Sequence, residues 1–293
     1  MLRRAIVQTK RILGLQNPGR NLAVLPDDTF LVSFPKSGNT WARFLIANLV
    51  RPDQKIDFSN VNDVIPGPEV TPNRQLVRLP GPRIIKSHQY FDPRYPRVIY
   101  IVRDPRDVVV SQYHFQRKRK LVSDGTPLTD FVERFIAGQT CYYGSWGEHV
   151  GSWIATKHGQ PGFLLLRYED MVADTPCELT KVARFLNVDA TPAQIAEAVA
   201  RSSADKMRQL EKSQAQQFSS TKNTRQDIAF VRAAKAGGWR ESLPEACALR
   251  IEQAWSRWIQ WLGYELLSGE TAGQSELHNA QLPAIASLVG PRA

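Results

Sequence analysis

Short apolar segments without alternation of apolar and polar positions recur along the chain and predict buried strands. The first covers residues 29–33, and three more follow at 83–86, 97–102 and 163–166. A strand that is covered by helices on both faces has no polar side, so an uninterrupted apolar run is typical of a parallel sheet. We therefore expect a central, mainly parallel sheet between two layers of helices.

Helices are predicted between these strands from apolar spacing and from start signals. Residues 39–50 place apolar side chains at helical spacing, which gives one mostly apolar stripe. Thr175 and Thr191 each precede a proline and stand three residues before a Glu or Gln, which predicts an N-cap and a capping box. A further helix, with three tryptophans, is expected to begin near Ser242. The alternation of strands and helices predicts a three-layer α/β/α fold in one domain, residues 1–293.

Four segments lack these patterns and flank or interrupt a core at about 29–262. Residues 51–82 hold six prolines among polar residues and predict an irregular excursion. Residues 208–238 are polar and rich in Gln, Ser and Lys, and we interpret them as a mobile lid. Residues 1–28 are expected to form an N-terminal arm, and residues 268–293, rich in small residues, a poorly ordered tail.

Composition and charge narrow the class of protein. Apolar residues make up 42% and charged residues 23%, which is typical of a soluble globular protein. A net charge of +10 indicates anionic partners, namely nucleic acid, a membrane surface or a polyanionic small molecule, or else only a basic surface. The chain has three cysteines without a Cys-x-x-Cys pair, no apolar stretch long enough to span a bilayer and no signal-peptide pattern. These features predict a cytoplasmic protein without a transmembrane segment.

The loop at residues 34–41 follows the first predicted strand directly and reads Phe-Pro-Lys-Ser-Gly-Asn-Thr-Trp. Backbone N–H groups at the start of the next helix, together with the charge of Lys36, would bind an anion. The loop differs from the G-x-x-x-x-G-K-[ST] pattern of nucleotide triphosphate sites, because Lys36 precedes Gly38. From these residues alone, the loop predicts either a phosphate site or an ordinary turn between strand and helix.

A second element begins at Arg103, where the third predicted strand ends. Pro105 stands where a helix can begin, and Ser111 falls about two turns along that helix. Arg103 and Ser111 would then hold a second phosphate from two sides, through a guanidinium fork and a hydroxyl. The alternative is that Arg103 forms a structural ion pair with Asp104 or Asp107.

Together, these two segments resemble the 5′-phosphosulfate loop and the 3′-phosphate motif of the sulfotransferases that use 3′-phosphoadenylyl sulfate. The resemblance extends in order over about 29–262. It implies an α/β fold with a P-loop-like phosphosulfate loop, 3′-phosphoadenylyl sulfate as co-substrate and adenosine 3′,5′-bisphosphate (PAP) as product. It also implies direct in-line transfer, without a metal, to a hydroxyl or amine of a small-molecule or carbohydrate acceptor.

The resemblance also assigns roles to individual residues. Lys86-Ser87-His88 looks like the family's Lys-Thr-His segment, in which His88 would be the general base and Lys86 would neutralise the transferred group. Histidine suits this task because its unperturbed pKa lies near neutrality. Lys36 would stabilise the leaving phosphate and so completes the catalytic set. The expected contacts with the co-substrate are Lys36, Ser37, Gly38, Asn39, Thr40, Trp41, Arg103, Ser111, Tyr168, Ser202 and Arg232.

Some positions depart from the family pattern. The family's Lys and first Gly after Arg232 are here Ala233 and Ala234, so one cation near the 3′-phosphate is missing, although Lys235 stands nearby. Ala204 stands where the family has a phenylalanine that flanks the adenine. The short dimerisation motif of cytosolic animal members is not evident, which leaves the oligomeric state open.

Two other functions stay open from the residues. A P-loop-type kinase for small molecules or nucleotides would share the architecture, but it needs a Mg²⁺ arrangement and a lysine in the Walker order. A nucleic-acid-binding protein without enzymatic activity would explain the charge, yet the one dense cationic run, within 116–120, is typical of a solvated helix end. We therefore predict no nucleic-acid partner, and no metal site, because no H-E-x-x-H or similar pattern occurs.

Overall fold

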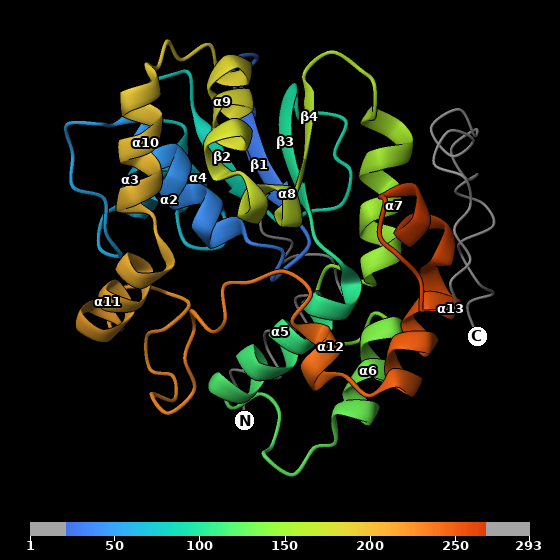
Figure 1. Cartoon of the computed structure of the whole chain (residues 1–293). Helices are drawn as coiled ribbons and strands as arrows, with labels where there is room; N and C mark the ends of the chain where they lie inside the picture. Colours follow the sequence, from blue (N-terminus) through green and yellow to red (C-terminus); the bar gives the residue numbers. More distant parts are fainter. Residues whose placement is uncertain (1–21, 268–293) are drawn as a thin grey trace.

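The computed structural model describes residues 22–267, and a four-stranded sheet with the order β2-β1-β3-β4 lies at its centre (Figure 1). All neighbouring strands are parallel, as the uninterrupted apolar runs predicted. Each strand begins and ends within one residue of its predicted range. The strands are β1 (Thr29–Ser33), β2 (Ile84–Ser87), β3 (Arg97–Val102) and β4 (Phe163–Arg167).

Side chains along the central strands alternate between two apolar cores, one on each face of the sheet. Phe30 and Val32 of β1 pack into one core, and Leu31 packs into the other. The same division separates Tyr100 from Ile99 on β3. Because both cores are apolar, neither face of the sheet needs polar residues, which explains the lack of alternation in the sequence.

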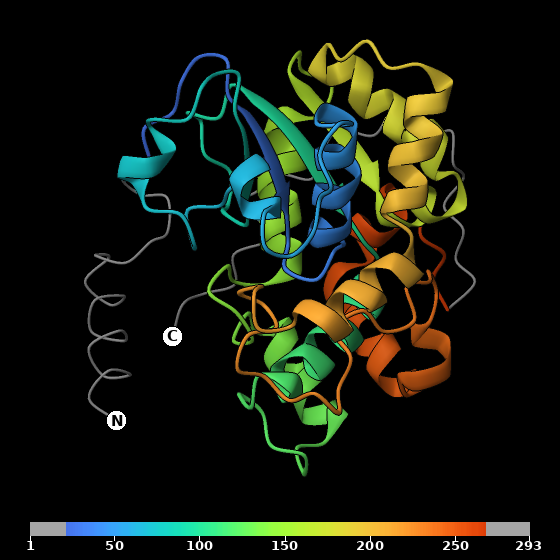
Figure 2. The same ribbon diagram turned by 90° about the vertical axis from the view of Figure 1, so that its left-hand side faces the viewer.

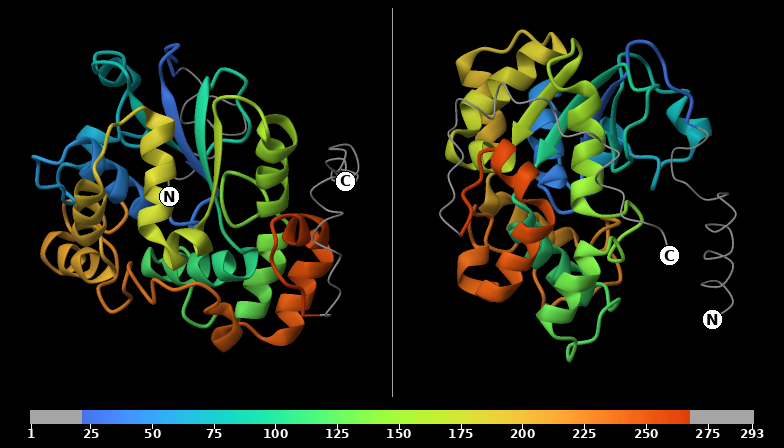
Figure 3. Two further views of the ribbon diagram at one scale, coloured as in Figure 1. Left: turned by 45° about the horizontal axis from the view of Figure 1, so that its top comes forward. Right: turned by 90° about the vertical axis from the view of Figure 1, so that its right-hand side faces the viewer.

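Helices cover both faces of the sheet, as seen from further sides in Figure 3, so the predicted three-layer α/β/α fold is confirmed. One face carries α5 (Pro105–Lys118), α6 (Leu128–Ile136), α7 (Trp146–Lys157) and α13 (Glu245–Trp261). The other face carries α2 (Asn39–Val50), α8 (Tyr168–Ala173), α9 (Thr175–Leu186) and α10 (Pro192–Arg201).

The helix starts follow the predicted signals, with one correction. Thr191 and Gln194 form the predicted capping box of α10, and the backbone N–H of Thr191 donates to the Gln194 side chain at 2.8 Å. The cap of α9 is Asp174, whereas Thr175, the predicted cap, is already helical. The Asp174 carboxylate stands one residue earlier and accepts a hydrogen bond from the backbone N–H of Cys177 at 3.0 Å.

The two segments predicted to be irregular contain short helices and contacts with the rest of the fold. Within 51–82 lie two single turns, α3 (Val61–Val64) and α4 (Asn73–Leu76). The predicted lid begins within α11 (Ala204–Gln214) and continues irregularly to α12 (Trp239–Ser242), beside α5 (Figure 2). The expected arm up to residue 21 and the expected tail lie outside the described residues.

One lysine anchors the predicted lid to the end of α5. Lys118 is buried and donates to the backbone oxygens of Arg225 at 2.8 Å and Ile228 at 2.7 Å. Its ammonium also lies 3.2 Å from Glu211 of α11. The prediction of a solvated helix end holds for Arg119 and Lys120, which are exposed, but not for Lys118, which ties two segments together.

Candidate active site

The carboxyl ends of the parallel strands open into a cavity of about 1200 Å³. Its walls come from the segments that follow the four strands, from α5 and from the segment that precedes α12. In open α/β sheets this edge is the usual place for a ligand. The structure brings together at this cavity every predicted site residue except Ser37, which is buried behind it: Lys36, Gly38, Asn39, Thr40, Trp41, Lys86, His88, Arg103, Ser111, Tyr168, Ser202 and Arg232.

The loop between β1 and α2 has a backbone that few residues adopt. Lys36 has a φ of 74° and Gly38 a φ of 99°. A Cβ atom at Gly38 would lie 2.5 Å from Cδ2 of Tyr168, so only glycine fits there. The Ser37 hydroxyl is buried and has no hydrogen-bond partner within residues 22–267. A buried hydroxyl without a partner, next to a helix N-terminus, fits a site that accepts an anionic ligand.

Lys36 lies in this loop without a carboxylate partner. Its ammonium is 4.2 Å from the ring centre of Phe115 and 4.5 Å from that of Phe230. Within residues 22–267, no Asp or Glu lies within ion-pair distance of it. Burial, together with the positive charges of the nearby Arg232 and Arg103, lowers the pKa of Lys36 to about 7. An anion in the cavity would stabilise the charged form of Lys36.

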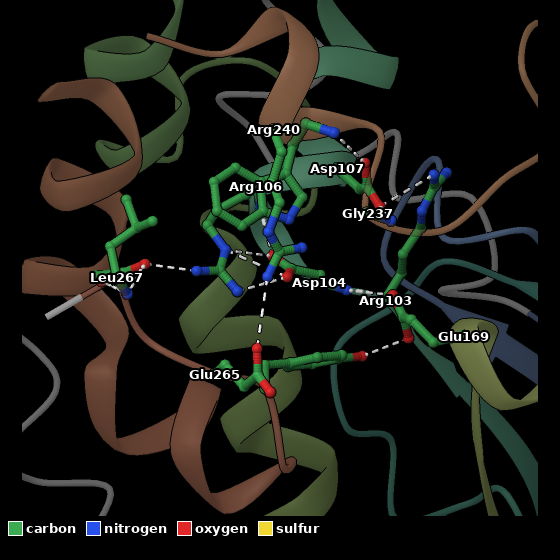
Figure 4. A network of polar contacts seen from close by, with 12 residues as sticks. Arg103, Asp104, Arg106, Asp107, Glu169, Gly237, Arg240, Glu265 and Leu267 are labelled. Atoms are coloured by element: carbon green, nitrogen blue, oxygen red, sulfur yellow. Dashed lines mark hydrogen bonds and ion pairs between the residues drawn. The ribbon is translucent and has the colours of Figure 1, made fainter. Parts of the chain in front are cut away.

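Arg103 faces the same cavity and forms the ion pair that the sequence offered as one of its two predicted arrangements. Its guanidinium lies over the ring of Tyr168, 4.2 Å from the ring centre, and forms an ion pair with Asp107 at 3.6 Å. Asp107 also accepts hydrogen bonds from the backbone N–H groups of Gly237 and Trp239, at 2.8 and 2.9 Å (Figure 4). The ion pair therefore fixes Arg103, while its Nε stays without a partner within the described residues.

The other arginine of this motif is structural. Arg106 is buried, and its guanidinium lies 2.7 Å from Asp104 and 2.5 Å from Glu252 of α13. Asp104 also caps α5, because its side chain accepts the backbone N–H of Arg106 at 2.9 Å. These contacts fix the start of α5 and hold α13 against it, which leaves Arg103 as the arginine directed to the cavity.

Ser111 and Arg232 complete this side of the cavity. Ser111 lies on α5 and Arg232 in the segment before α12. Burial lowers the pKa of Arg232, and Arg103 lowers it further, so the two guanidinium groups are close enough to repel each other. A phosphate bound between them would relieve this repulsion.

On the opposite side, His88 follows β2 and is partly buried. Its Nδ1 lies 2.7 Å from the backbone oxygen of Ser33. Because a carbonyl oxygen only accepts, Nδ1 carries the proton and Nε2 is left as a base. Burial lowers the pKa of His88 to about 3, and the charge of Lys86 contributes to this shift. His88 is therefore neutral near pH 7, the state that a general base needs.

Lys86, two residues earlier, is held by a carboxylate that the sequence did not point to. Its ammonium lies 3.1 Å from Glu69, which comes from the proline-rich excursion. The hydroxyl of Tyr143 donates to the same carboxylate oxygen at 3.3 Å. A single carboxylate in an irregular segment has no periodic signal, so the sequence patterns did not indicate Glu69.

The aromatic side of the cavity contains Trp41 and Tyr168, whose rings meet edge to face with centres 5.9 Å apart. The indole N–H of Trp41 donates to the backbone oxygen of Ser202 at 3.0 Å. The Ser202 hydroxyl is buried and accepts a hydrogen bond from Asn48 at 3.1 Å. The cavity wall also includes alanines at the departures from the family pattern, namely Ala204, Ala233 and Ala234.

Two further observations concern other classes of site. Within residues 22–267, no group of three or more His, Cys, Asp or Glu side chains is arranged to hold a metal ion. No helix in that range has the length and apolar character needed to cross a membrane.

Comparisons with known proteins all identify the same protein family. The model of a family described as the sulfotransferase domain matches residues 26–263. Sulfotransferase 1B1 of Canis lupus familiaris is 30% identical over 231 residues, which cover 73% of this chain and 77% of the relative. The 3-beta-hydroxysteroid sulfotransferase of Cavia porcellus is 30% identical over 242 residues, which cover 78% and 83%. The crystal structure of mouse sulfotransferase SULT7A1 complexed with PAP has 26% identity and a TM-score of 0.65, and the match covers 80% of this chain and 84% of that one.

Proposed function

Because this chain belongs to the sulfotransferase domain family and is a sulfotransferase, we propose that it transfers a sulfuryl group from 3′-phosphoadenylyl sulfate to a hydroxyl or amine of a small acceptor. The family assignment confirms the resemblance and the class of enzyme predicted from the sequence, and it decides against the kinase and the non-enzymatic alternative. The PAP in the mouse structure bears out the predicted co-substrate.

One observation carries the proposal: the same cavity contains an uncompensated lysine and a neutral histidine, at the ends of adjacent strands. Lys36 follows β1 and His88 follows β2, and these strands pair directly. The cation suits the phosphate of a leaving group, and the free Nε2 of His88 suits the hydroxyl that attacks.

The residues on the anion side fit the co-substrate in their chemistry. The backbone N–H groups of residues 37–40 and the Thr40 hydroxyl, which lines the cavity, would hold the 5′ end, and a small shift of the loop would bring the unpartnered Ser37 hydroxyl to it. Arg103, Ser111 and Arg232 would hold the 3′-phosphate. Trp41 and Tyr168 would contact the adenine, with Ser202 holding the indole of Trp41 in place. When bound, the co-substrate supplies the sulfuryl group and a phosphate as its leaving group.

The chain's own residues then divide the work of transfer. His88 Nε2 takes the proton of the acceptor hydroxyl as the new bond from that oxygen to sulfur forms and the bond from sulfur to the bridging phosphate oxygen breaks. Lys36 offsets the charge that develops on the departing phosphate, and Lys86 offsets that of the sulfuryl oxygens. The products are the sulfated acceptor and PAP, and His88 returns its proton to water.

The acceptor and the compartment belong to the proposal as well. One relative is named for 3-beta-hydroxysteroids, so steroid alcohols should be in the first panel of acceptors, with phenols, amines and sugars. The cysteine content fits a reducing compartment, and we place the enzyme in the cytoplasm.

The test is an assay of PAP release from 3′-phosphoadenylyl sulfate across this panel, with the wild type and His88→Asn. Asparagine keeps a donor for the Ser33 oxygen but supplies no base. We expect PAP to bind His88→Asn within about twofold of the wild type while turnover falls by roughly 10²- to 10⁴-fold. Equal turnover would remove His88 from the reaction, and a wild type that neither binds PAP nor releases it would refute the function.

A further inference from the structure

Glu69 lies on the acceptor side of the cavity, and the mechanism above gives it no role. Its side chain is 21% exposed, and that of Lys86 is 16% exposed. One of its oxygens, Oε1, forms an ion pair with the Lys86 ammonium at 3.1 Å and accepts a hydrogen bond from the Tyr143 hydroxyl at 3.3 Å. The ring of Tyr143 in turn lies near the imidazole of His88, with ring centres 5.6 Å apart. Glu69 therefore belongs to the group of side chains that surrounds the base.

The backbone around Glu69 leaves room for its ion pair. The N–H of Lys86 donates to the backbone oxygen of Pro66 at 2.8 Å, which docks the excursion on β2. A Cβ atom at Gly67 would lie 2.8 Å from Oε2 of Glu69 and 2.9 Å from Cδ of Lys86. A side chain at position 67 would have to displace one of these two groups, and the glycine leaves both in place.

The charges near His88 show why a carboxylate is needed there. Within residues 22–267, no carboxylate forms an ion pair with the imidazole, whose Nδ1 contacts the Ser33 oxygen. When His88 takes a proton, the imidazolium forms beside the Lys86 ammonium, and the two cations repel each other. Arg43 adds a third positive charge to this region. His149 is neutral near pH 7, because burial lowers its pKa to about 4.

Glu69 is the negative charge that opposes these cations. Burial alone would raise the pKa of Glu69, but Lys86 and His88 hold it below its ordinary value. The carboxylate is therefore ionised near pH 7. Its charge acts in the opposite direction on its neighbours, because it favours the charged forms of Lys86 and His88.

We propose that Glu69 is a positioning residue that holds Lys86 in place and supplies the negative charge that offsets the imidazolium formed on His88 during transfer. This inference rests on the proposed function, because the imidazolium exists only if His88 is the base. Tyr143 orients the carboxylate through its hydroxyl and contributes no charge, because its pKa is raised by burial and by Glu69.

The first test needs no acceptor. The amine of Lys86 is titrated by NMR in ¹⁵N-lysine-labelled wild type, Glu69→Gln, Glu69→Asp and Tyr143→Phe. We expect Lys86 to titrate at lower pH in Glu69→Gln than in the wild type, because the amide keeps the shape and removes the charge. Tyr143→Phe is the matched control, and it should leave the titration almost unchanged. An unchanged titration in Glu69→Gln would overturn the inference.

The second test measures PAP affinity and turnover with the best acceptor of the panel. We expect Glu69→Gln to bind PAP within about twofold of the wild type while kcat falls by roughly tenfold or more. Glu69→Asp, which keeps the charge, should recover part of the loss. Turnover of Glu69→Gln equal to that of the wild type would overturn the inference. If the wild type itself transfers nothing, the proposed function fails, and the titration alone then decides whether Glu69 holds the charge of Lys86.

Discussion

Lys36 and Lys86, two of the lysines that line the cavity, differ in whether a carboxylate lies beside them. Lys86 forms an ion pair with Glu69 at 3.1 Å. Lys36 instead lies between two aromatic rings and near two arginines, with no such partner within residues 22–267. Burial lowers the pKa of both side chains. For Lys86 the next largest influence is Glu69, which opposes the shift, whereas for Lys36 two arginines add to the shift before Glu211 opposes it.

This difference divides the cavity into a half around Lys36 and a half around Lys86, and each half is suited to a ligand of different charge. An uncompensated cation is costly to the free protein and is stabilised once an anion binds, so the Lys36 half is suited to a permanently anionic ligand. A cation that already has its counter-ion gains little from another anion. The Lys86 half is therefore suited to an uncharged acceptor and to charge that develops only during the reaction.

The largest expected effect separates binding from turnover. We expect Lys36→Met to weaken PAP binding by about 10- to 100-fold, because a hydrogen bond to a charged group contributes about 1.5–3 kcal/mol. Lys86→Met should bind PAP within about threefold of the wild type and lose roughly 100-fold in kcat. Calorimetric titration with PAP and steady-state turnover measure the two quantities.

Lys55→Met is the control for this pair, because Lys55 is exposed and lies outside the cavity wall. It should change neither quantity. A loss of PAP affinity in Lys86→Met as large as that in Lys36→Met would contradict the division into two halves.

The elements of the fold that frame both halves were predictable, because they depend on local pattern. Buried strands covered on both faces leave uninterrupted apolar runs. Helix α2 begins and ends as its spacing indicated, and α5 begins at Pro105, as predicted. The correction at Asp174 shows the limit of such signals. Two neighbouring residues, Asp174 and Thr175, can both cap a helix, and only the backbone decides which one does.

The site was predictable only where a motif is contiguous in the sequence. The loop around Lys36 and the segment from Arg103 carry their chemistry within a few residues. Glu69 meets Lys86 only because the excursion folds back on β2, and His88 takes its tautomer from the backbone oxygen of Ser33. Contacts of this kind depend on tertiary structure and on main-chain atoms, which residue types along one chain do not reveal.

The pH dependence of PAP binding would sharpen the comparison and should have a smaller effect. In the free protein the pKa of Lys36 is lowered to about 7, and a bound phosphate would raise it. Below pH 7 the lysine is already charged and affinity is greatest. Above pH 7 binding must take up a proton, so Kd should rise with pH by at most about tenfold per unit.

The measurement is calorimetry from pH 7 to 9 in two buffers of different ionisation enthalpy, which reports the proton taken up. In Lys36→Met the rise of Kd should be absent, while in Lys86→Met it should persist. A Kd that is independent of pH in the wild type would show that Lys36 is charged in the free protein, and the contrast between the lysines would then be weaker.

The smallest effect is expected in the stability of the PAP-free protein. In the unfolded chain a lysine titrates near pH 10.4, so between that value and about 7 the unfolded state binds more protons than the folded state does. The wild type therefore bears the full cost of the buried Lys36 charge at pH 7 and below. The gain in stability of a variant without this charge is largest there, and it disappears as the pH rises toward 10. Lys36→Met should unfold a few degrees above the wild type at pH 7, since about 1 kcal/mol shifts the Tm of a domain of this size by about 2–4 °C. Lys86→Met should unfold below the wild type, because Glu69 loses its partner. Thermal unfolding at pH 7, 8, 9 and 10 measures both effects. If Lys36→Met were less stable than the wild type at pH 7, the contacts of Lys36 with Phe115 and Phe230 would outweigh the cost of its charge.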